Sequence, residues 1–378
     1  MKALGMLIKP VSGGCNMNCR YCFYADVANS REVQSYGAMT LQTLQTLVQK
    51  VFSGTWGAVS FMFQGGEPTL RGLGFYRRLV EYVAEYNIKK IPVSYGIQTN
   101  GHALDEEWAK FLADNRFLAG VSLDGTKEIH NRNRLDRQGN DTHSTVMRTI
   151  RLFKKYGVEF NILTVVTAEA ARHIDSIYSF YKKNGLRYLQ FIPCIDDFDA
   201  PWGERPYSLT PALYETVLKR LFDYWYQDVL RGDHTYIRFF DSLLFRFAGR
   251  KSPDCGMNGR CENQMVIEAD GSVYPCDFYV VDRYRIGNLL TDNWDEILRY
   301  GETGPFILES EQINKECKSC RWYSLCMGGC RRYRQQRDTL GLFYFCEAYK
   351  GFFEYAADRM LLLANQTIRQ RQAGKLPG

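Results

Sequence analysis

Three cysteines near the N-terminus, Cys15, Cys19 and Cys22, follow the spacing C-x3-C-x2-C in the run GGCNMNCRYCFYAD. Three thiolates this close together can hold three corners of a [4Fe–4S] cluster and leave the fourth iron open to a small ligand. A cluster with an open iron suggests chemistry as well as electron transfer. Three ligands of a zinc site are the alternative. Zinc would need a fourth partner, however, no His lies nearby, and the aromatic Tyr21 inside the triplet is unusual for a zinc knuckle.

The composition is that of a globular protein with a large core, because 45% of the 378 residues are hydrophobic and 24% are charged. The net charge of +6 is modest, and no long basic run indicates a nucleic-acid partner. The apolar stretches are too short to span a bilayer, and strand-like sequence begins where a signal peptide would lie. We therefore expect a cytoplasmic protein with neither a nucleic-acid nor a membrane partner.

The chain has twelve cysteines, and eight of them lie in its C-terminal third. Disulfides are rare in cytosolic proteins, so this grouping favours metal binding. Only Cys194 stands alone, and a Cys of that kind is often a small apolar core residue. The candidate metal ligands of the C-terminal third are Cys255, Cys261, Cys276, Cys317, Cys320, Cys326, Cys330 and Cys346.

Strand-like and helix-like segments alternate over residues 1–235, which we expect to form the first domain. Six βα repeats predict a parallel sheet with right-handed crossovers, and six strands are too few for a closed eight-stranded barrel. The predicted fold is therefore an α/β open barrel of the (β/α)6 kind. Thr40 and Asp105 are the expected N-caps of two of its helices. The predicted strands are 4–10, 58–64, 93–99, 118–124, 159–167 and 188–194.

Four polar motifs, GGCNMNC, QGGEPT, QTNG and SLDG, begin where a strand pattern stops. Functional residues of such barrels gather at the carboxyl ends of the strands. The motifs are therefore expected at one edge of the sheet.

Beyond residue 250 the segments become short, Cys-rich and punctuated by Gly. Residues 265–282 read as a β-hairpin turned at Asp270-Gly271, and residues 349–371 read as a helix before a polar tail. We expect a second, Cys-rich α+β domain over 236–346, and the helix and tail over 347–378.

The three N-terminal cysteines together with GGEP at 65–68 resemble the radical S-adenosylmethionine (SAM) superfamily. This resemblance implies a partial (β/α)6 radical SAM barrel in which SAM binds the open iron of the cluster. It also implies that Gly65, Gly66 and Glu67 meet the methionine amino group of SAM. Without the cysteines, GGEP would read as a turn.

The C-terminal cysteines resemble the SPASM domain, which carries auxiliary iron–sulfur clusters. The pattern consists of Cys261-x9-Gly271-x4-Cys276, then Cys317-x2-Cys320-x5-Cys326-x3-Cys330, then Cys346. A pair of structural zinc sites is the alternative. By the resemblance, one [4Fe–4S] cluster is held by Cys255, Cys261, Cys276 and Cys330, and a second by Cys317, Cys320, Cys326 and Cys346.

Over about residues 4–360 the chain resembles anaerobic sulfatase-maturating enzymes, through IKPVSGGCNMNCRYCFY, FQGGEPTL, CGMNG and SVYPCDFYV. Members of that family oxidise a Cys or Ser of a sulfatase, within a C/S-x-P-x-R type segment, to Cα-formylglycine. The resemblance implies that a 5′-deoxyadenosyl radical takes a hydrogen from the substrate Cβ and that Asp277 accepts a proton. A structural Asp beside Cys276 is the alternative. Because the base must be ionised, we expect a donor or a cation beside it.

The same resemblance assigns the remaining contacts. Tyr21, Ser122 and Arg134 would meet SAM, Ile195 would meet its adenine, and Gln98 would add a polar contact. Tyr24 and Gln64 would lie near the substrate peptide. Each has a simpler alternative, such as a strand cap for Ser122 or a surface ion pair for Arg134.

The expected partners are an unfolded sulfatase polypeptide and a flavodoxin- or ferredoxin-like electron donor. The alternative function, also found with SPASM clusters, is a maturase that forms a thioether or another crosslink in a ribosomally made peptide. A non-catalytic iron–sulfur or zinc protein is a further alternative.

Overall fold

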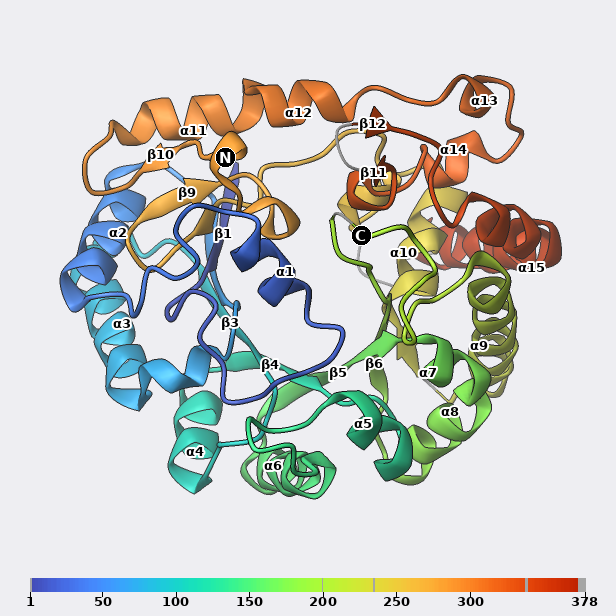
Figure 1. The fold of residues 1–378 in the computed structure, drawn as a ribbon, viewed down its shortest axis with the longest axis horizontal. Helices are drawn as coiled ribbons and strands as arrows, with labels where there is room; N and C mark the ends of the chain where they lie inside the picture. The colour runs from blue at the N-terminus through green and yellow to red at the C-terminus, as the bar shows by residue number, and fades with distance from the viewer. Residues whose placement is uncertain (1, 199, 234, 337–338, 373–378) are drawn as a thin grey trace. The chain divides into compact units, whose positions relative to one another are not determined.

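The computed structural model describes residues 2–198, 200–233, 235–336 and 339–372, and Figure 1 shows the order of the elements. All six strands predicted for the barrel are present, and their bounds differ from the expected ones by at most two residues. They are β1 (Ala3–Ile8), β2 (Ala58–Phe63), β3 (Val93–Thr99), β4 (Phe117–Ser122), β5 (Glu159–Val166) and β6 (Tyr188–Pro193).

The chain forms two compact units that interleave along the sequence. The first comprises Met1–Leu123, Lys127–Ile162 and Glu262–Ile307, and the second comprises Asp124–Thr126, Leu163–Cys261 and Leu308–Gly378. The domain bounds 1–235, 236–346 and 347–378 stay a prediction, and the polar tail over 373–378 lies outside the described residues.

The first unit contains a parallel sheet of β1, β2, β3 and β4 in sequence order. Ile8 pairs with Phe63, Phe63 with Ile97, and Ile97 with Ala119. The carboxyl ends of these strands therefore lie at one edge, and the polar motifs that follow them are brought to that edge as expected.

Amphipathic helices cover this sheet, and α2, α3 and α4 lie along its outer side in Figure 1. The predicted N-caps are confirmed, because Thr40 Oγ1 accepts from Thr43 N and Asp105 Oδ1 accepts from Trp108 N, each at 3.0 Å. The helices of this unit are α1 (Phe23–Asn29), α2 (Leu41–Ser53), α3 (Leu73–Tyr86), α4 (Glu106–Asp114), α5 (Lys127–Asn133), α6 (His143–Tyr156) and α11 (Trp294–Thr303).

The predicted hairpin is confirmed and belongs to this first unit. Strand β8 (Val266–Ile267) pairs antiparallel with β9 (Ser272–Tyr274), and β9 pairs antiparallel with β10 (Gly287–Asn288). Gly271 turns the hairpin with a φ of +88°. Strand β8 also pairs in parallel with β1, so the segment that carries Asp277 joins the sheet that carries the N-terminal cysteines.

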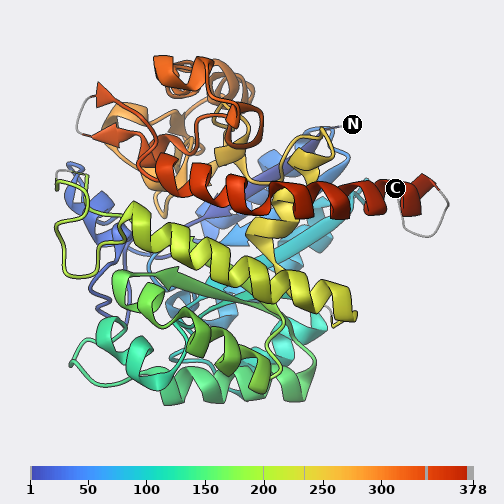
Figure 2. The same ribbon diagram turned by 90° about the vertical axis from the view of Figure 1, so that its right-hand side faces the viewer.

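The second unit holds β6 beside the two-residue strand β7 (Tyr236–Ile237), together with most of the C-terminal helices. Its longest helices, α9 (Pro211–Arg231) and α15 (Cys346–Gln372), lie side by side in Figure 2. Aromatic side chains of Phe222, Phe240 and Phe352 pack in its core. The other α-helices and strands of this unit are α7 (Ala168–Arg172), α8 (Ile174–Lys183), α10 (Arg238–Phe247), α13 (Lys315–Lys318), α14 (Tyr323–Cys326), β11 (Gln335–Gln336) and β12 (Thr339–Leu340). Helix α12 (Pro305–Ser310) begins in the first unit and ends in the second.

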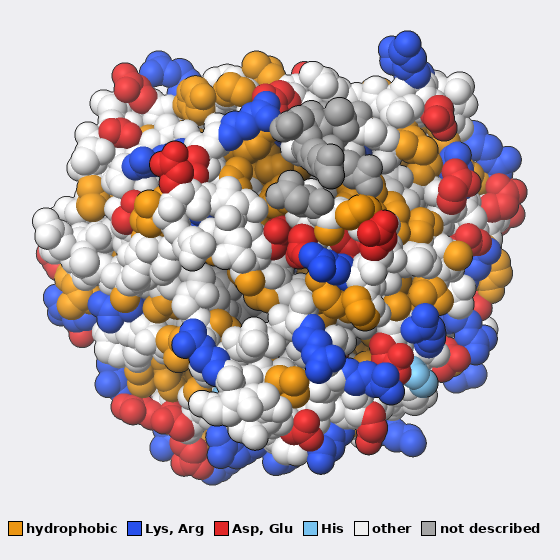
Figure 3. All heavy atoms as spheres, viewed as in Figure 1, with side chains coloured by type: hydrophobic (Ala, Val, Ile, Leu, Met, Phe, Trp, Pro, Cys, Tyr) orange, Lys and Arg blue, Asp and Glu red, His pale blue; other side chains and the backbone are white. Residues whose placement is uncertain are grey.

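No helix in the described part of the chain is both long enough and apolar enough to cross a membrane. On the face shown in Figure 3, Lys and Arg side chains lie interspersed with Asp and Glu side chains, as the small net charge leads one to expect.

Candidate functional site

The cysteine motif lies in the loop that follows β1, and hydrogen bonds tie this loop to the segment after α5. Asn18 N donates to Leu135 O at 2.9 Å, and Arg20 N donates to Asn133 O at 3.0 Å. Cys22 is the N-cap of α1, and all three cysteines of the motif are partly buried. The loop therefore presents three thiols from a braced backbone.

Cys15 lies in a polar environment that suits a ligating sulfur. Its Sγ accepts from Met17 N at 3.4 Å and from Asn100 Nδ2 at 3.6 Å. Burial raises the pKa of the Cys15 thiol, and these two hydrogen bonds oppose the rise. A [4Fe–4S] cluster needs thiolate ligands with such donors, so the residues present fit the cluster.

The two glycines of GGEP are required by close packing against the cysteine loop. Gly65 has a φ of +124°, and a Cβ on Gly66 would lie 2.0 Å from the backbone oxygen of Gly14. Gly66 N donates to Ser12 O at 3.0 Å, which joins the loops after β1 and β2. Any side chain at Gly66 would push the cysteine loop away.

Glu67 is buried, and most of its acceptor capacity is used by the protein itself. Oε1 accepts from Thr69 N, Thr69 Oγ1 and Thr99 Oγ1 at 3.1, 2.6 and 2.9 Å, and Oε2 accepts from Asn100 N at 2.7 Å. Burial raises the pKa of Glu67, and these hydrogen bonds oppose the rise. The carboxylate thus joins the ends of β2 and β3, while Oε2 keeps one acceptor position for a further donor.

Four of the five other predicted SAM contacts form two pairs in the first unit. Arg134 Nη1 donates to Tyr21 Oη at 2.9 Å, and both side chains are buried. Gln98 Nε2 donates to Ser122 Oγ at 3.1 Å, which joins the ends of β3 and β4. Ile195 is buried in the second unit, two residues after the end of β6.

Asp277, Tyr24 and Gln64 form one hydrogen-bonded group. Tyr24 Oη and Gln64 Nε2 both donate to Asp277 Oδ2, at 2.6 and 2.9 Å, and Gln64 Nε2 also donates to Tyr24 Oη at 2.5 Å. Asp277 is only 6% exposed, and its backbone N donates to Gln264 Oε1. Three residues from distant parts of the sequence therefore converge on one carboxylate.

The second oxygen of this carboxylate differs from the first. Asp277 Oδ1 is buried, and no described residue makes a hydrogen bond to it. A buried acceptor without a partner is costly, so it requires an explanation, and a catalytic role is one such explanation. Oδ1 is therefore the atom on which an incoming proton can be accepted.

Three buried charges that the sequence motifs do not reveal lie beside this group. Glu268 lies 2.7 Å from Arg31 Nη1 and 3.5 Å from Lys9 Nζ, and the Lys9 ammonium lies 4.8 Å from the Tyr24 ring centre. Burial raises the pKa of Glu268, but the charges of Lys9 and Arg31 outweigh it and leave that pKa below its ordinary value. Charged residues within strand-like runs, such as Lys9 in MLIKP, are the only sequence signal for this network.

The environment of Asp277 supplies the donors that the sequence analysis expected. Burial raises the pKa of Asp277, whereas the Lys9 charge and the hydrogen bonds from Tyr24 and Gln64 oppose that rise. Burial and the Asp277 charge raise the pKa of Tyr24 well above its ordinary value, so its hydroxyl keeps its proton and acts as the donor.

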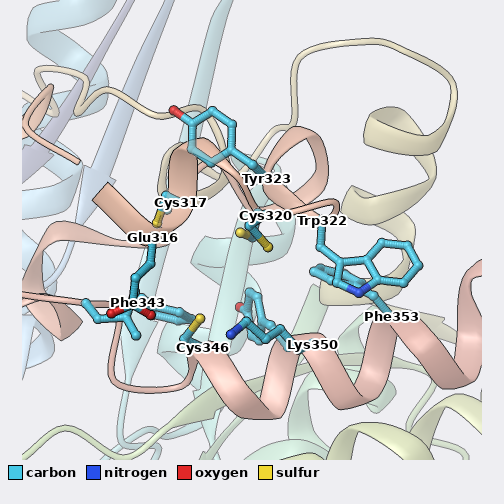
Figure 4. A pocket seen from close by; sticks show the side chains of 13 residues that line it. Glu316, Cys317, Cys320, Trp322, Tyr323, Phe343, Cys346, Lys350 and Phe353 are labelled. Carbon is cyan, nitrogen blue, oxygen red and sulfur yellow. The ribbon is translucent and has the colours of Figure 1, made fainter. Parts of the chain in front are cut away.

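Four of the C-terminal cysteines line a pocket of the second unit. Figure 4 shows Cys317, Cys320 and Cys346 facing this pocket beside Lys350, and Cys326 also lines it. In the described ranges no three His, Cys, Asp or Glu side chains are grouped as around a single metal ion. A cubane cluster is wider than one ion, so its thiolates stand further apart.

Elsewhere in the second unit, a Cβ on Gly256 would lie 3.1 Å from the Cβ of Cys330, and Cys261 N donates to Ser310 Oγ at 2.9 Å. Burial raises the pKa of Cys330 to about 11, and the charge of the buried Arg334 opposes the rise. Cys255, Cys261 and Cys330 belong to the second unit and Cys276 to the first.

The chain matches two protein families in the expected places. Residues 10–181 match the Radical SAM superfamily, and residues 255–321 match an Iron-sulfur cluster-binding domain named SPASM. The cofactors are therefore SAM and iron–sulfur clusters, as predicted, and the zinc alternatives are not supported.

Two of the relatives that cover nearly the whole chain are anaerobic sulfatase-maturating enzymes of different types. A Cysteine-type anaerobic sulfatase-maturating enzyme of Clostridium perfringens is 48% identical over 97% of this chain and 99% of the relative. A Serine-type anaerobic sulfatase-maturating enzyme of Bacteroides thetaiotaomicron is 29% identical over 98% of this chain and 93% of the relative.

A solved structure with the same fold is native anSMEcpe with bound AdoMet and Cp18Cys peptide. It has a TM-score of 0.92 and 48% identity, and the match covers 97% of this chain and 99% of that one. Streptococcus suis SuiB, at 16% identity and a TM-score of 0.61, shares the fold alone. The predicted fold class, a radical SAM α/β barrel with a SPASM domain, is confirmed, and the chain belongs to the family of anaerobic sulfatase-maturating enzymes.

Proposed function

We propose that this chain oxidises a Cys side chain in a C-x-P-x-R type segment of a sulfatase to Cα-formylglycine without oxygen. Three Cys-type relatives are 47–49% identical to it over nearly its whole length, whereas the Ser-type relatives are 28–29% identical. This difference supports Cys, rather than Ser, as the preferred substrate residue.

The residues after β1, β2, β3 and β4 would hold the cofactors. Cys15, Cys19 and Cys22 would ligate the cluster that binds SAM, and the braced loop of Gly65 and Gly66 would meet the methionine amino group. When bound, SAM and the clusters supply the 5′-deoxyadenosyl radical and the electron acceptor that a two-electron oxidation requires. The SAM contacts proposed beyond the loop are Glu67, Tyr21, Arg134, Gln98, Ser122 and Ile195.

The Tyr21–Arg134 pair suits the carboxylate of SAM. A buried guanidinium is a strong, planar donor for a carboxylate, and the hydrogen bond to Tyr21 Oη fixes its direction. The Gln98–Ser122 pair offers a neutral polar contact at the adjacent strand end.

Asp277 is the proposed base, and the main support is that its Oδ1 has no hydrogen-bond partner among the described residues. Because Tyr24 and Gln64 hold Oδ2, the carboxylate cannot rotate freely, and Oδ1 stays available for the proton of the substrate thiol. Tyr24 and Gln64 would thus line the place where the substrate Cys lies. The charge of Lys9 favours the ionised form that a base requires.

The auxiliary ligand sets stay as proposed from the sequence. One set is Cys255, Cys261, Cys276 and Cys330, and the other is Cys317, Cys320, Cys326 and Cys346.

The substrate would be an unfolded sulfatase polypeptide, the reductant would be a flavodoxin- or ferredoxin-like protein, and the reaction would take place in the cytoplasm. The domain division 1–235, 236–346 and 347–378 is part of the same proposal.

The alternative, a crosslinking maturase of ribosomally made peptides, has less support. The likeness to SuiB is one of fold only, at 16% identity, whereas a Cysteine-type anaerobic sulfatase-maturating enzyme is 48% identical over 97% of this chain.

The variant Asp277→Asn tests the proposal. Asn keeps the shape of Asp277 but cannot accept the thiol proton, so formylglycine formation should fall by roughly a hundredfold or more while SAM cleavage persists. The matched control is Asp282→Asn, the same change at an exposed position of the same segment. Iron content is measured on both variants, because a merely structural Asp would lower iron and product together. Normal product from Asp277→Asn with full iron would remove Asp277 from the mechanism.

A further inference from the structure

Asn100 directly follows β3, in the QTNG motif, and its side chain is 7% exposed. Its Nδ2 donates to Asn16 Oδ1 at 2.7 Å and to Cys15 Sγ at 3.6 Å. Its Oδ1 accepts from His102 N at 2.9 Å. The side chain therefore makes one hydrogen bond through each of its two amide hydrogens and one through its oxygen.

These partners fix which end of the amide faces the cysteine. The donor His102 N requires the oxygen on its side, and the acceptor Asn16 Oδ1 requires the nitrogen on the other. The N–H directed at Cys15 Sγ thus follows from the whole network rather than from one distance.

An N–H donor to a ligating sulfur stabilises the form of a cluster that carries more negative charge, which is the reduced form. We propose that Asn100 is a positioning residue that acts through Cys15 to raise the reduction potential of the SAM-binding cluster. The inference rests on the proposed ligation of that cluster by Cys15, Cys19 and Cys22.

A purely structural role for Asn100 makes a different prediction. Its backbone N donates to Glu67 Oε2 at 2.7 Å and already joins the ends of β2 and β3, and this bond does not depend on the side chain. If the side chain only braced the cysteine loop, its loss would lower cluster content but would leave the potential of the remaining cluster unchanged.

The test is a potentiometric titration of the full, anaerobically loaded chain, followed by electron paramagnetic resonance. The SAM-binding cluster is the one whose signal changes on addition of SAM. Asn100→Leu removes the donor at nearly constant size. The matched control is Asn18→Leu, the same change on an exposed side chain of the cysteine loop.

Asn100→Leu should make reduction of the cluster less favourable, on the order of tenfold. This factor corresponds to a midpoint about 59 mV more negative for a one-electron couple. The Asn18→Leu midpoint should equal that of the wild type. Should Asn100→Leu fail to retain iron, Asn100→Ala removes the same donor without placing a branched apolar group beside the loop, and it carries the same expectation.

An Asn100 variant with full iron and the wild-type midpoint would overturn the inference. A wild-type chain without any SAM-sensitive cluster signal would instead defeat the proposed cluster ligation, so the two failures are distinguishable.

Discussion

The buried charge network beside Asp277 gives a prediction whose size follows from the structure. Glu268 is fully buried between Lys9 and Arg31, whose side chains are 2% and 1% exposed. Glu268→Gln keeps the shape but leaves two buried cations without their common anion. Breaking a buried ion pair in this way costs about 3–5 kcal/mol.

The control is an ion pair of the same type at the surface. Arg77 and Glu107 lie 2.6 Å apart with side chains 51% and 64% exposed. Such a pair contributes about 0–1 kcal/mol, so Glu107→Gln should change stability little.

The assay is anaerobic thermal unfolding of the loaded protein at one scan rate, because a multi-cluster protein does not unfold in two states. With a slope of about 2 °C per kcal/mol for a large domain, Glu268→Gln should lower the apparent Tm by roughly 6–10 °C. An apparent Tm of Glu268→Gln equal to that of Glu107→Gln would refute the reasoning.

Gly66→Ala should abolish SAM cleavage and lower iron content, because its Cβ would lie 2.0 Å from Gly14 O, whereas Gly74→Ala, whose Cβ meets nothing within 4 Å, should be active. Burial raises the pKa of Asp241 to about 7 in the folded protein. The carboxyl of the unfolded chain therefore loses its proton at a lower pH than that of the folded protein. Because the folded state binds the extra proton between about pH 4 and 7, the free energy of unfolding falls as pH rises through this range. Asp241→Asn should therefore raise the Tm more at about pH 8 than at about pH 6, and an equal change at both would contradict it. Cys320→Ala should lose the iron of one cluster and become less soluble, since binding energy at such a site is also folding energy, and a soluble protein with full iron would argue against this.

Local pattern was enough to predict the strands and the caps. Alternation and turn residues placed the six strands within two residues, and Thr40 and Asp105 cap helices as expected. These features depend on neighbours along the chain, which is why the sequence reveals them.

The charge network could not be predicted, because it depends on pairing between distant segments. Strand β8 joins β1 in parallel, and this register brings Glu268 to Lys9 and Arg31. Sequence pattern indicated a separate C-terminal domain, and nothing in it indicated that the hairpin of Glu268 completes the N-terminal sheet.

The role of the GGEP glycines is also visible only in three dimensions. The family resemblance implied that Gly65 and Gly66 meet the methionine amino group of SAM, and the structure adds close packing of Gly66 against the cysteine loop at Gly14. The filled acceptors of Glu67 likewise depend on Thr99 and Asn100, which follow a different strand.

The central claim is that this chain takes a hydrogen from Cβ of a substrate Cys and leaves an aldehyde there. The most direct test uses a sulfatase-type peptide whose Cys carries deuterium at Cβ, incubated anaerobically with loaded enzyme, reductant and SAM. Mass spectrometry should find deuterium in 5′-deoxyadenosine together with formylglycine in the peptide, in equal amounts. Deuterium-free 5′-deoxyadenosine, or a crosslinked peptide without an aldehyde, would contradict the account.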